Sequence, residues 1–360
     1  MVHEIAFLAI SQAHQFMHWL PAALRLAAEP GVRVTVLVSS SAGKDFIRSY
    51  DPDERLQIKR LHAPTVGRHG LFSPPPRLPV LLLNARSIAR YRTIVTTETT
   101  SSVLRRLPGF RSKMVHLKHG AGDREGGYNP KHAEFDLTLV NGPKDKQRLI
   151  ERGLANDNNC VVVGYGKFEL VRQTPDSIFA NNQPIALYNP HFDKTVGTWA
   201  RHGRKIVRTM ESIPGWNFVV APHVKLRGGP AIRSDAGHIV IDRGSTRSID
   251  MSYTQAASVY IGDASSQVYE FIRTPRACIF LNLERIDWHA NPAYAHWHLG
   301  QVIESADELP AALARAHSLQ AQFEPAQLAA SSASIDQADI PASERQARAI
   351  LAFARSAHGG

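Results

Sequence analysis

The sequence predicts an α/β fold with two doubly wound parallel sheets. Short apolar segments alternate with helix-like segments along most of the chain, which is typical of parallel strands joined by helices. The apolar segments, such as residues 33–39, are continuous runs, and this pattern indicates strands that are buried on both faces. The chain has 360 residues, which is too long for one ordinary domain and suits two.

The first half of the chain predicts one complete domain. Its expected strands lie at residues 4–11, 33–39, 56–61, 93–97, 113–118, 135–140 and 161–163, and its expected helices at residues 14–28, 42–50, 78–90, 101–107 and 143–154. A polar segment punctuated by proline follows at residues 172–184. This composition is typical of a linker, so we place the first domain at residues 1–171.

The second half repeats the alternation and predicts a second domain at residues 185–340. Its expected strands lie within residues 185–192, 216–223, 238–242, 259–262 and 277–282, and its expected helices at residues 198–210, 248–257, 265–273 and 307–318. A last helix lies within residues 341–360. Its apolar side chains fall at helical spacing on one face, which we expect to pack back on the first domain. They are Ala347, Ile350, Leu351 and Ala354.

The composition narrows the class of partner. The formal net charge is +10, from 42 Lys and Arg against 32 Asp and Glu, which favours anionic partners. Nucleic acid is not expected, since no nucleic-acid-binding motif or long basic run is present. The N-terminus lacks a signal-peptide pattern, and the apolar stretch at residues 78–83 is too short to span a bilayer. We therefore expect a cytoplasmic protein, either soluble or peripheral on the inner face of the membrane.

Ligands of parallel sheets bind beyond the carboxyl ends of the strands, so the segments that follow strands hold the candidate residues. In the first half, His14 follows the first strand and His119 closes another. Glycines at positions 120, 122, 126 and 127 come directly after His119, and such a loop allows the backbone to approach a ligand closely. A histidine there can act as a general base near neutral pH. The alternative is a surface loop with an incidental histidine.

In the second half, the ends of three expected strands carry side chains that suit a phosphate. These side chains are His191; His223 with Lys225 and Arg227; and Asp263 with Ser265 and Ser266. Two adjacent serines at the start of a helix would offer hydroxyls and backbone N–H groups at the positive end of the helix dipole. The simpler alternative is that Asp263 or Ser265 only caps that helix.

No Walker A pattern is present, and we assign no metal site from the sequence. The sequence therefore calls for no cofactor beyond a nucleotide-linked substrate.

Taken in order, these segments resemble the CDP-glycerol glycerophosphotransferase family, the teichoic acid polymerase-like enzymes of the GT-B fold. His119-Gly120 resembles the family's His-Gly motif, and residues 188–193 resemble its Y-x-P-T-F-R strand end. Residues 219–223 resemble its histidine-terminated strand, and residues 250–266 its D-x-x-x-a-D-x-x-I-T-D-Y-S-S motif. The likeness covers roughly residues 115–275.

This chain departs from the family pattern around the site. Lys118 stands where the family has Trp, His191 replaces a Thr, Asp193 an Arg and Ala264 a Tyr. His223 is preceded rather than followed by a proline. These changes surround the donor and the acceptor, so they point to a divergent branch that uses CDP-glycerol or another activated alcohol or sugar.

The resemblance implies two Rossmann-like domains that face a central cleft, with the acceptor on the first domain and the nucleotide donor on the second. It implies transfer of a glycerol-phosphate or similar polyol-phosphate group from a CDP-activated donor to a hydroxyl of a cell-envelope glycan or lipid-linked acceptor. His119 would be the base and His223 would contact the donor phosphates. The other donor contacts would be Asp263, Ser265, Ser266, Lys225 and Arg227, and further cleft candidates are Gly120, His14, Tyr188, His191 and Asp250.

Other functions stay open. A GT-B glycosyltransferase that uses a UDP- or CDP-linked sugar would keep the same phosphate-binding residues. A nucleotide-sugar 2-epimerase is a third reading, and a non-catalytic protein that binds nucleotides or anionic polymers is a fourth.

Overall fold

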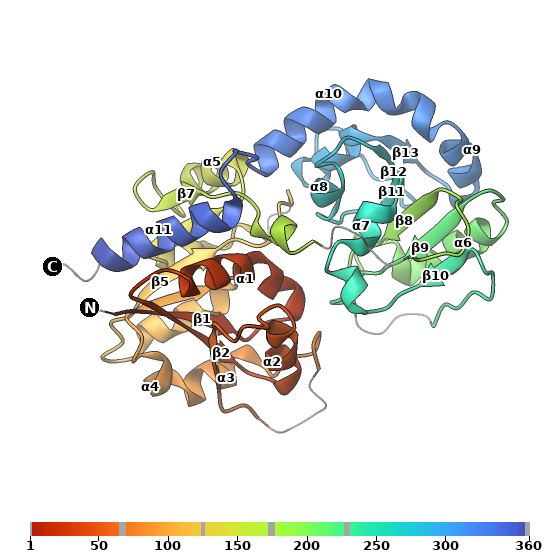
Figure 1. Cartoon of the computed structure of the whole chain (residues 1–360). Helices are drawn as coiled ribbons and strands as arrows, with labels where there is room; N and C mark the ends of the chain where they lie inside the picture. Colours follow the sequence, from red (N-terminus) through yellow and green to blue (C-terminus); the bar gives the residue numbers. More distant parts are fainter. Residues whose placement is uncertain (1, 65–69, 124–126, 172–176, 227–230, 357–360) are drawn as a thin grey trace. The chain divides into compact units, whose positions relative to one another are not determined.

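A computed structural model describes residues 2–64, 70–123, 127–171, 177–226 and 231–356 (Figure 1). The internal contacts divide the chain into two compact units. Unit 1 comprises Met1–His119, Tyr128–Leu170 and Ser334–Gly360, and unit 2 comprises Gly120–Gly127 and Val171–Ala333.

The described part of unit 1 contains a seven-stranded parallel sheet in the order β3-β2-β1-β4-β5-β6-β7. The strands are β1 (His3–Ala9), β2 (Val32–Val38), β3 (Gln57–Arg60), β4 (Thr93–Thr96), β5 (Lys113–Leu117), β6 (Leu137–Val140) and β7 (Cys160–Val162). The first strand lies in the middle of the sheet, and the order reverses between β1 and β4. This reversal is the topological switch point of a doubly wound sheet, beyond which ligands bind.

Helices cover both faces of the unit 1 sheet. They are α1 (Ala13–Ala27), α2 (Ser41–Arg48), α3 (Arg77–Leu83), α4 (Ala85–Ile88), η1 (Thr99–Arg106), η3 (Pro130–Glu134), α5 (Pro143–Glu151), η4 (Gly166–Leu170) and α11 (Ala342–Ser356). Trp19 of α1 packs on Phe7 of β1, with ring centroids 5.2 Å apart. Val80 of α3 belongs to a second core, which contains Leu8 of the same strand. Side chains on both faces of β1 are thus buried, as its continuous apolar run predicts.

The predicted helix at residues 78–90 forms two shorter helices, α3 and α4, with a break at Asn84. The Asn84 amide donates hydrogen bonds of 2.7 Å to the carbonyls of Val80 and His62, and its side-chain oxygen accepts one of 2.9 Å from the His62 N–H. This side chain competes with the helix for backbone partners, so the helix breaks where it stands.

Among its described residues, unit 2 forms a six-stranded parallel sheet in the order β10-β9-β8-β11-β12-β13. The strands are β8 (Ile185–Asn189), β9 (Asn217–Val220), β10 (Ile239–Ile241), β11 (Val259–Gly262), β12 (Ala277–Leu281) and β13 (Gln301–Ile303). The order repeats that of the first six strands of unit 1. Its switch point lies between β8 and β11, where Ile261 is opposite Tyr188.

The helices of unit 2 are α6 (Trp199–Glu211), η5 (Thr246–Ser248), α7 (Ser252–Ala256), α8 (Val268–Phe271), η6 (Pro292–Leu299), η7 (Ala306–Glu308), α9 (Leu309–Ala314) and α10 (Ala316–Ser334). The helix predicted at residues 265–273 is only the single turn α8. The Arg276 guanidinium donates 2.6 Å to the carbonyl of Phe271, the last residue of α8, and Pro275 precedes this arginine. Both features end the helix early.

The internal contacts assign two segments to the other unit from the one that the predicted domain boundaries gave them. Residues 120–127 belong to unit 2, because Asp123 bonds within it, as set out below. Residues 334–340 belong to unit 1, where the Asp336 N–H donates 2.9 Å to the Asn141 carbonyl. Of the predicted linker, residues 172–176 lie outside the described residues. The side chain of Asn181, further along it, accepts a hydrogen bond of 2.6 Å from Asn217.

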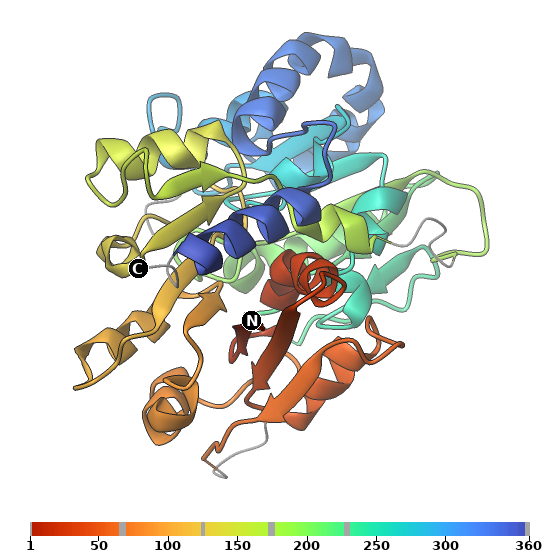
Figure 2. The same ribbon diagram turned by 60° about the vertical axis from the view of Figure 1, so that its left-hand side comes forward.

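The last helix, α11, packs on unit 1 against α1 and η4 (Figure 2). The Ser343 N–H donates 2.7 Å to the carboxylate of Glu169, which anchors the start of α11 to η4. The buried apolar side chains of α11 are Ala347, Ile350, Leu351 and Ala354. Within the described residues, the structure holds no helix with the length and hydropathy needed to cross a bilayer.

Candidate functional site

The strand order of unit 2 sets three candidate segments side by side. Since β9, β8 and β11 are neighbours in the sheet, the segments after them carry His223, His191 and residues 263–266 along one edge. Asn189, the last residue of β8, ties the three ends together. Its amide donates 2.6 Å to the carbonyl of Ala221, after β9, and its side-chain oxygen accepts 2.9 Å from the hydroxyl of Ser265, after β11. Asn189 is buried and belongs to none of the sequence candidates.

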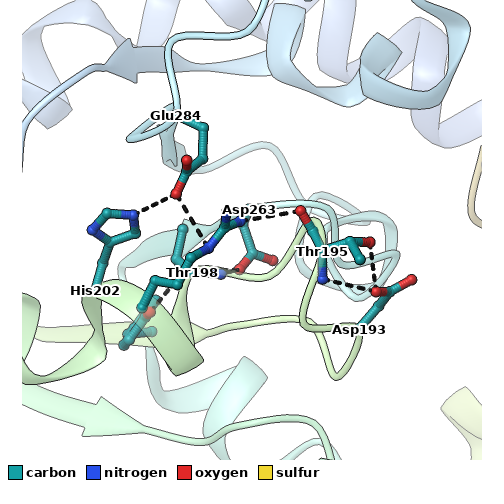
Figure 3. Close-up of polar contacts among 8 residues, drawn as sticks. Asp193, Thr195, Thr198, His202, Asp263 and Glu284 are labelled. Atoms are coloured by element: carbon teal, nitrogen blue, oxygen red, sulfur yellow. Dashed lines mark hydrogen bonds and ion pairs between the residues drawn. The ribbon is translucent and has the colours of Figure 1, made fainter.

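Asp263 organises this edge (Figure 3). Its side chain is buried, and its carboxylate accepts hydrogen bonds of 2.6–2.9 Å. The donors are the backbone N–H groups of His191, Thr198 and Ala264 and the hydroxyl of Thr198. Burial raises the pKa of Asp263, and these donors act in the opposite direction. The carboxylate thus holds the segment after β8 and the start of α6 in place.

This geometry corrects the prediction that Asp263 holds the donor phosphates. Its oxygens are engaged by internal donors, and a buried carboxylate repels a phosphate. The backbone carbonyl of Asp263 is occupied as well, accepting 2.8 Å from His296 Nε2 and 2.7 Å from Trp297 Nε1. Asp263 therefore shapes the site rather than contacting the donor.

The two serines differ in what they offer. Ser265 is buried, and its hydroxyl donates to Asn189 and accepts 3.4 Å from the Gln267 N–H, so it acts as an internal support. Ser266 is half-buried, and no hydrogen bond joins its hydroxyl to another group in the part of the chain that the structure describes. Because α8 is a single turn, its dipole contributes little, and of the two serine hydroxyls only that of Ser265 is engaged within the described residues.

The glycine-rich loop lies against Ser266 within unit 2. A Cβ atom added to Gly122 would lie 2.6 Å from the Ser266 Cβ, and one added to Gly120 would lie 3.8 Å from the Ser266 Oγ. Gly120 also has a φ of +71°, which a side chain rarely tolerates. The glycines thus allow the backbone of the loop to reach the serine. Gly126 lies outside the described residues.

Asp123 fastens this loop to the unit. Its carboxylate accepts a hydrogen bond from the Tyr269 hydroxyl and lies 3.9 Å from His296 Nδ1, and all three side chains are buried. Since the other nitrogen of His296 bonds to the carbonyl of Asp263, one polar network joins the loop to the centre of the edge. Sequence reasoning missed this network, because Asp123 and Tyr269 are 146 residues apart and form no motif.

The hydrogen bonds of His191 and His223 define their tautomers. The Nδ1 atom of His191 accepts 3.1 Å from the Asp193 N–H, and that of His223 accepts 3.1 Å from the Lys225 N–H. In each neutral ring the proton therefore sits on Nε2, which becomes a donor suited to anionic oxygens. The two ring centroids are 6.1 Å apart, and Phe192 packs on both rings.

Of the two basic residues predicted after His223, the structure describes Lys225. Lys225 has its ammonium 5.4 Å from the centre of the Phe192 ring, so it stands beside the histidine pair. Arg227 lies outside the described residues.

Tyr188 and Asp250 have structural roles, which corrects their prediction as cleft residues. Tyr188 lies in the core of unit 2 with its hydroxyl 2.7 Å from the Thr198 hydroxyl, and burial raises its pKa well above the usual value. The carboxylate of Asp250 accepts 2.9 Å from the Ser252 N–H and 2.6 Å from the Ser252 hydroxyl. These bonds close the turn before α7, where Met251 has a φ of +68°.

His119 lies in unit 1, after β5, and has the opposite tautomer. Its Nδ1 atom lies 2.6 Å from the Thr97 carbonyl oxygen. A carbonyl can only accept, so Nδ1 carries the proton and Nε2 is the nitrogen that can take one. The rings of His14 and His18 on α1 stand beside it, with centroids 6.3 and 6.1 Å away.

A pocket of about 350 Å³ opens between the segments after β8 and β12 of unit 2. Glu284 lies on its wall between Arg201 Nε at 3.2 Å and His202 Nε2 at 2.6 Å (Figure 3). The hydrogen bond from His202 lowers the pKa of Glu284. The charged groups and the aromatic rings of Tyr294 and Trp297 suit a polar ligand, and no sequence pattern indicated them.

In the part of the chain that is described, no group of three or more His, Cys, Asp or Glu side chains has an arrangement that could hold a metal ion.

Two parallel sheets with this strand order, one in each unit, define a fold of the GT-B class, which confirms the predicted fold class. Solved structures of that class resemble the chain. The wall teichoic acid polymerase TagF, soaked with CDPG, aligns with a TM-score of 0.68 at 11% identity over 99% of this chain and 90% of that chain. TagF is thus a structural neighbour, as the family resemblance implies.

Two further neighbours are structures that contain UDP or a UDP-sugar. S. aureus MnaA with UDP aligns with a TM-score of 0.67 at 13% identity over 99% of this chain and 97% of that one. The UDP-GlcNAc 2-epimerase from Neisseria meningitidis, bound to UDP-GlcNAc, gives 0.62 at 10% identity over 98% and 99%. At such identities the likeness is one of fold. No family model and no curated protein matches the sequence.

Proposed function

We propose that the chain is a transferase that moves glycerol phosphate, or a similar polyol phosphate, from a CDP-linked donor to a hydroxyl of a cell-envelope glycan or lipid-linked acceptor. The observation that carries this proposal is the contrast between tautomers. His191 and His223 present donors to anions, whereas His119 presents an acceptor for a proton. The ordered motifs and the fold shared with TagF, a structure soaked with CDPG, support the choice of donor.

On the donor side, unit 2 supplies the groups that hold the two phosphates. The Nε2–H groups of His191 and His223 and the hydroxyl of Ser266 donate hydrogen bonds, and Lys225 adds positive charge. The hydrogen bonds of Asp263 and Ser265 described above hold the segments that carry these groups in place. Donors held rigidly in this way stabilise the charge that develops during transfer of a phosphoryl group.

On the acceptor side, His119 Nε2 takes the proton of the attacking hydroxyl. The hydroxyl oxygen forms a bond to the phosphorus next to the polyol, and the bond from that phosphorus to the bridging oxygen breaks. The bridging oxygen leaves with the nucleotide as CMP, and the transferred phosphate becomes a diester. The reaction is a substitution, so it needs no oxidant or reductant.

A thermal-shift screen tests the donor. We expect CDP-glycerol, CDP-ribitol and CMP to raise the melting temperature, because a ligand present at about 100 times its Kd stabilises the folded state by about 2.7 kcal/mol. UMP and UDP-sugars serve as the comparison. If no nucleotide shifts the melting temperature, the donor site is not where we place it.

Two substitutions separate the base from the donor contacts. His119→Ala should lower the rate of CMP release roughly 10²–10⁴-fold, the usual contribution of a general base, and leave the nucleotide-induced thermal shift intact. His223→Ala should reduce the thermal shift and the rate together. His289→Ala, at a side chain that is 73% exposed, is the control. Loss of nucleotide binding in His119→Ala would contradict the assignment.

The second candidate function is an enzyme that acts on a nucleotide sugar, and the neighbours that contain UDP or UDP-GlcNAc favour it. The same phosphate contacts would then hold UDP, and the sugar would replace the polyol. Stabilisation by UDP-GlcNAc or UMP, with no response to cytidine nucleotides, would establish this candidate in place of the first.

A further inference from the structure

The glycine-rich loop is joined to unit 1 through Lys118 on one side and Tyr128 on the other, and one carboxylate binds both residues. The Oδ1 atom of Asp145 accepts 2.8 Å from the Lys118 ammonium and 2.8 Å from the Tyr128 hydroxyl. The Lys118 ammonium also lies 4.7 Å from the centre of the Tyr128 ring. Each of these three side chains therefore contacts the other two, and we call them the stem cluster.

The stem cluster lies away from solvent. The side chains of Lys118 and Asp145 are 6% and 0% exposed, and Tyr128 is buried as well. Burial raises the pKa of Tyr128 well above its usual value, and the charge of Asp145 adds to this effect, so the phenol keeps the proton that it donates. A buried ion pair is often no more stabilising than apolar side chains in its place, so its presence here points to a requirement on geometry.

The stem cluster fixes the backbone that carries His119. The Lys118 N–H donates 2.8 Å to the Leu139 carbonyl of β6, while the Lys118 ammonium is held by Asp145, in the first turn of α5. His119 follows directly and contacts a different element, since its Nδ1 atom bonds to the Thr97 carbonyl after β4. The peptide between Lys118 and His119 is thus anchored in two directions.

We propose that Asp145 is a positioning residue for His119. By binding Lys118 and Tyr128 it fixes both stems of the loop, and it thereby holds the His119 ring at the angle at which Nε2 takes the proton of the acceptor hydroxyl. A Trp, which the resembling family has in place of Lys118, cannot form this ion pair. The role of Asp145 in the reaction rests on the proposed function, whereas its hold on the His119 ring does not.

Tyr128→Phe tests the proposal, because it removes one hydroxyl and keeps the buried ring. With CDP-glycerol as donor and glycerol as a simple hydroxyl acceptor, kcat for CMP release should fall about tenfold, while KM for the donor and the nucleotide-induced thermal shift stay as in the wild type.

NMR of the full-length chain with ¹⁵N-labelled histidine gives a readout that does not depend on turnover. At about pH 8, where a free histidine is neutral, the two ring nitrogens of His119 should differ strongly in chemical shift, because one hydrogen bond fixes the tautomer. In Tyr128→Phe this difference should shrink, since a ring released from one orientation exchanges between tautomers. A His119→Gln sample identifies the signal.

A double variant tests Asp145 itself. Lys118→Met combined with Asp145→Leu removes both charges together, so neither is left buried without its partner. It should lower kcat and reduce the His119 shift difference as Tyr128→Phe does.

Tyr91→Phe is the matched control. Tyr91 is another buried tyrosine of unit 1, and its hydroxyl accepts 3.1 Å from the Lys59 ammonium. This variant should leave kcat and the His119 signal unchanged. The proposal is overturned if Tyr91→Phe causes the same losses. It is also overturned if the stem variants lower only the melting temperature, because the cluster then serves stability alone.

The proposed function can fail separately. If no nucleotide shifts the melting temperature while the His119 signal still responds to Tyr128→Phe and not to Tyr91→Phe, the transfer reaction is wrong and the positioning of the ring by the stem cluster is confirmed.

Discussion

The roles of individual residues at the edge of unit 2 follow from which hydrogen bonds are already made. The carboxylate of Asp263 and the hydroxyl of Ser265 are engaged by internal partners, so they hold the site together. The Ser266 hydroxyl makes no hydrogen bond to another group among the described residues, so it stays a candidate for contact with a ligand. Neighbouring residues of one motif thus divide into support and contact.

The closeness of Gly122 to Ser266 gives a prediction at the scale of one residue. Gly122→Ala should lower the free energy of unfolding of unit 2 by about 1–3 kcal/mol, because the new Cβ would lie 2.6 Å from the Ser266 Cβ and something must shift. Ser266→Gly in the same chain removes the clash and should recover most of the loss. Urea unfolding of the single and double variants measures the coupling.

Gly237→Ala is the control, since its added Cβ would meet no heavy atom within 4 Å. Equal losses in both single variants, or no recovery in the double variant, would contradict the close approach of the loop to Ser266.

At the scale of elements, buried histidines of unit 1 join β5 to η3, and α1 to the segment before η4. His116 of β5 packs edge-on against His132 of η3 with ring centroids 4.5 Å apart, and His18 of α1 packs on Tyr165 at 4.8 Å. Burial lowers the pKa of both His18 and His116, and nearby positive groups add to it: Lys167 for His18, and His132 for His116. In the folded unit both rings are therefore favoured in the neutral form.

The stability of unit 1 should therefore depend on pH in a defined direction. The folded pKa of His18 and His116 is lower than the unfolded one, so below about pH 6.5 the unfolded chain binds protons that the folded chain does not. The stabilisation that the two neutral histidines give to the folded state is complete above that pH. As the pH drops toward their lowered folded-state pKa values, the free energy of unfolding falls by at most about 1.4 kcal/mol per pH unit for each histidine. Denaturant unfolding between neutral pH and pH 5 measures the slope.

His116→Gln should make this slope shallower, whatever it does to the stability at neutral pH. His289→Ala, at an exposed position, should leave the slope as it is. A slope unchanged in His116→Gln would show that this histidine is not kept neutral by the fold.

At the scale of the whole molecule, the end of the chain completes the first unit. Helix α11 follows unit 2 in the sequence but packs on α1 and η4, so unit 1 cannot form its full core until the chain is finished. Ile350 is fully buried in that contact.

Ile350→Ala should therefore lower the free energy of unfolding of unit 1 by about 2–5 kcal/mol, the usual range for removing a buried isoleucine side chain. Ile340→Ala makes the same chemical change at a side chain that is 42% exposed and should change it by less than about 0.5 kcal/mol. Hydrogen exchange of α1 and α11 locates the effect. Similar losses in both variants would mean that α11 does not complete the unit 1 core.

The fold class could be predicted because its signals are local. Continuous apolar runs and the helices between them are visible in short windows, and the break at Asn84 was missed because it depends on the carbonyl of His62, twenty-two residues away. The site was predicted less completely. His119, His191 and His223 stand out by their position after strands, and their roles stay predictions. Asn189 stands at a variable position of the strand-end motif at residues 188–193, and Asp123 and Glu284 lie in no motif. No local pattern marks the three residues, because their partners are distant in sequence.

By itself, the sequence determined two parallel α/β units and the strand ends where polar side chains would gather, since strand burial and the crossing order of a doubly wound sheet follow from local patterns. Only the tertiary structure decided which of those side chains face inward. The carboxylate of Asp263 accepts hydrogen bonds from the segment after β8, and each histidine tautomer is set by one hydrogen-bond partner. Hydrogen bonds between distant segments exist only after folding, so no local pattern contains them.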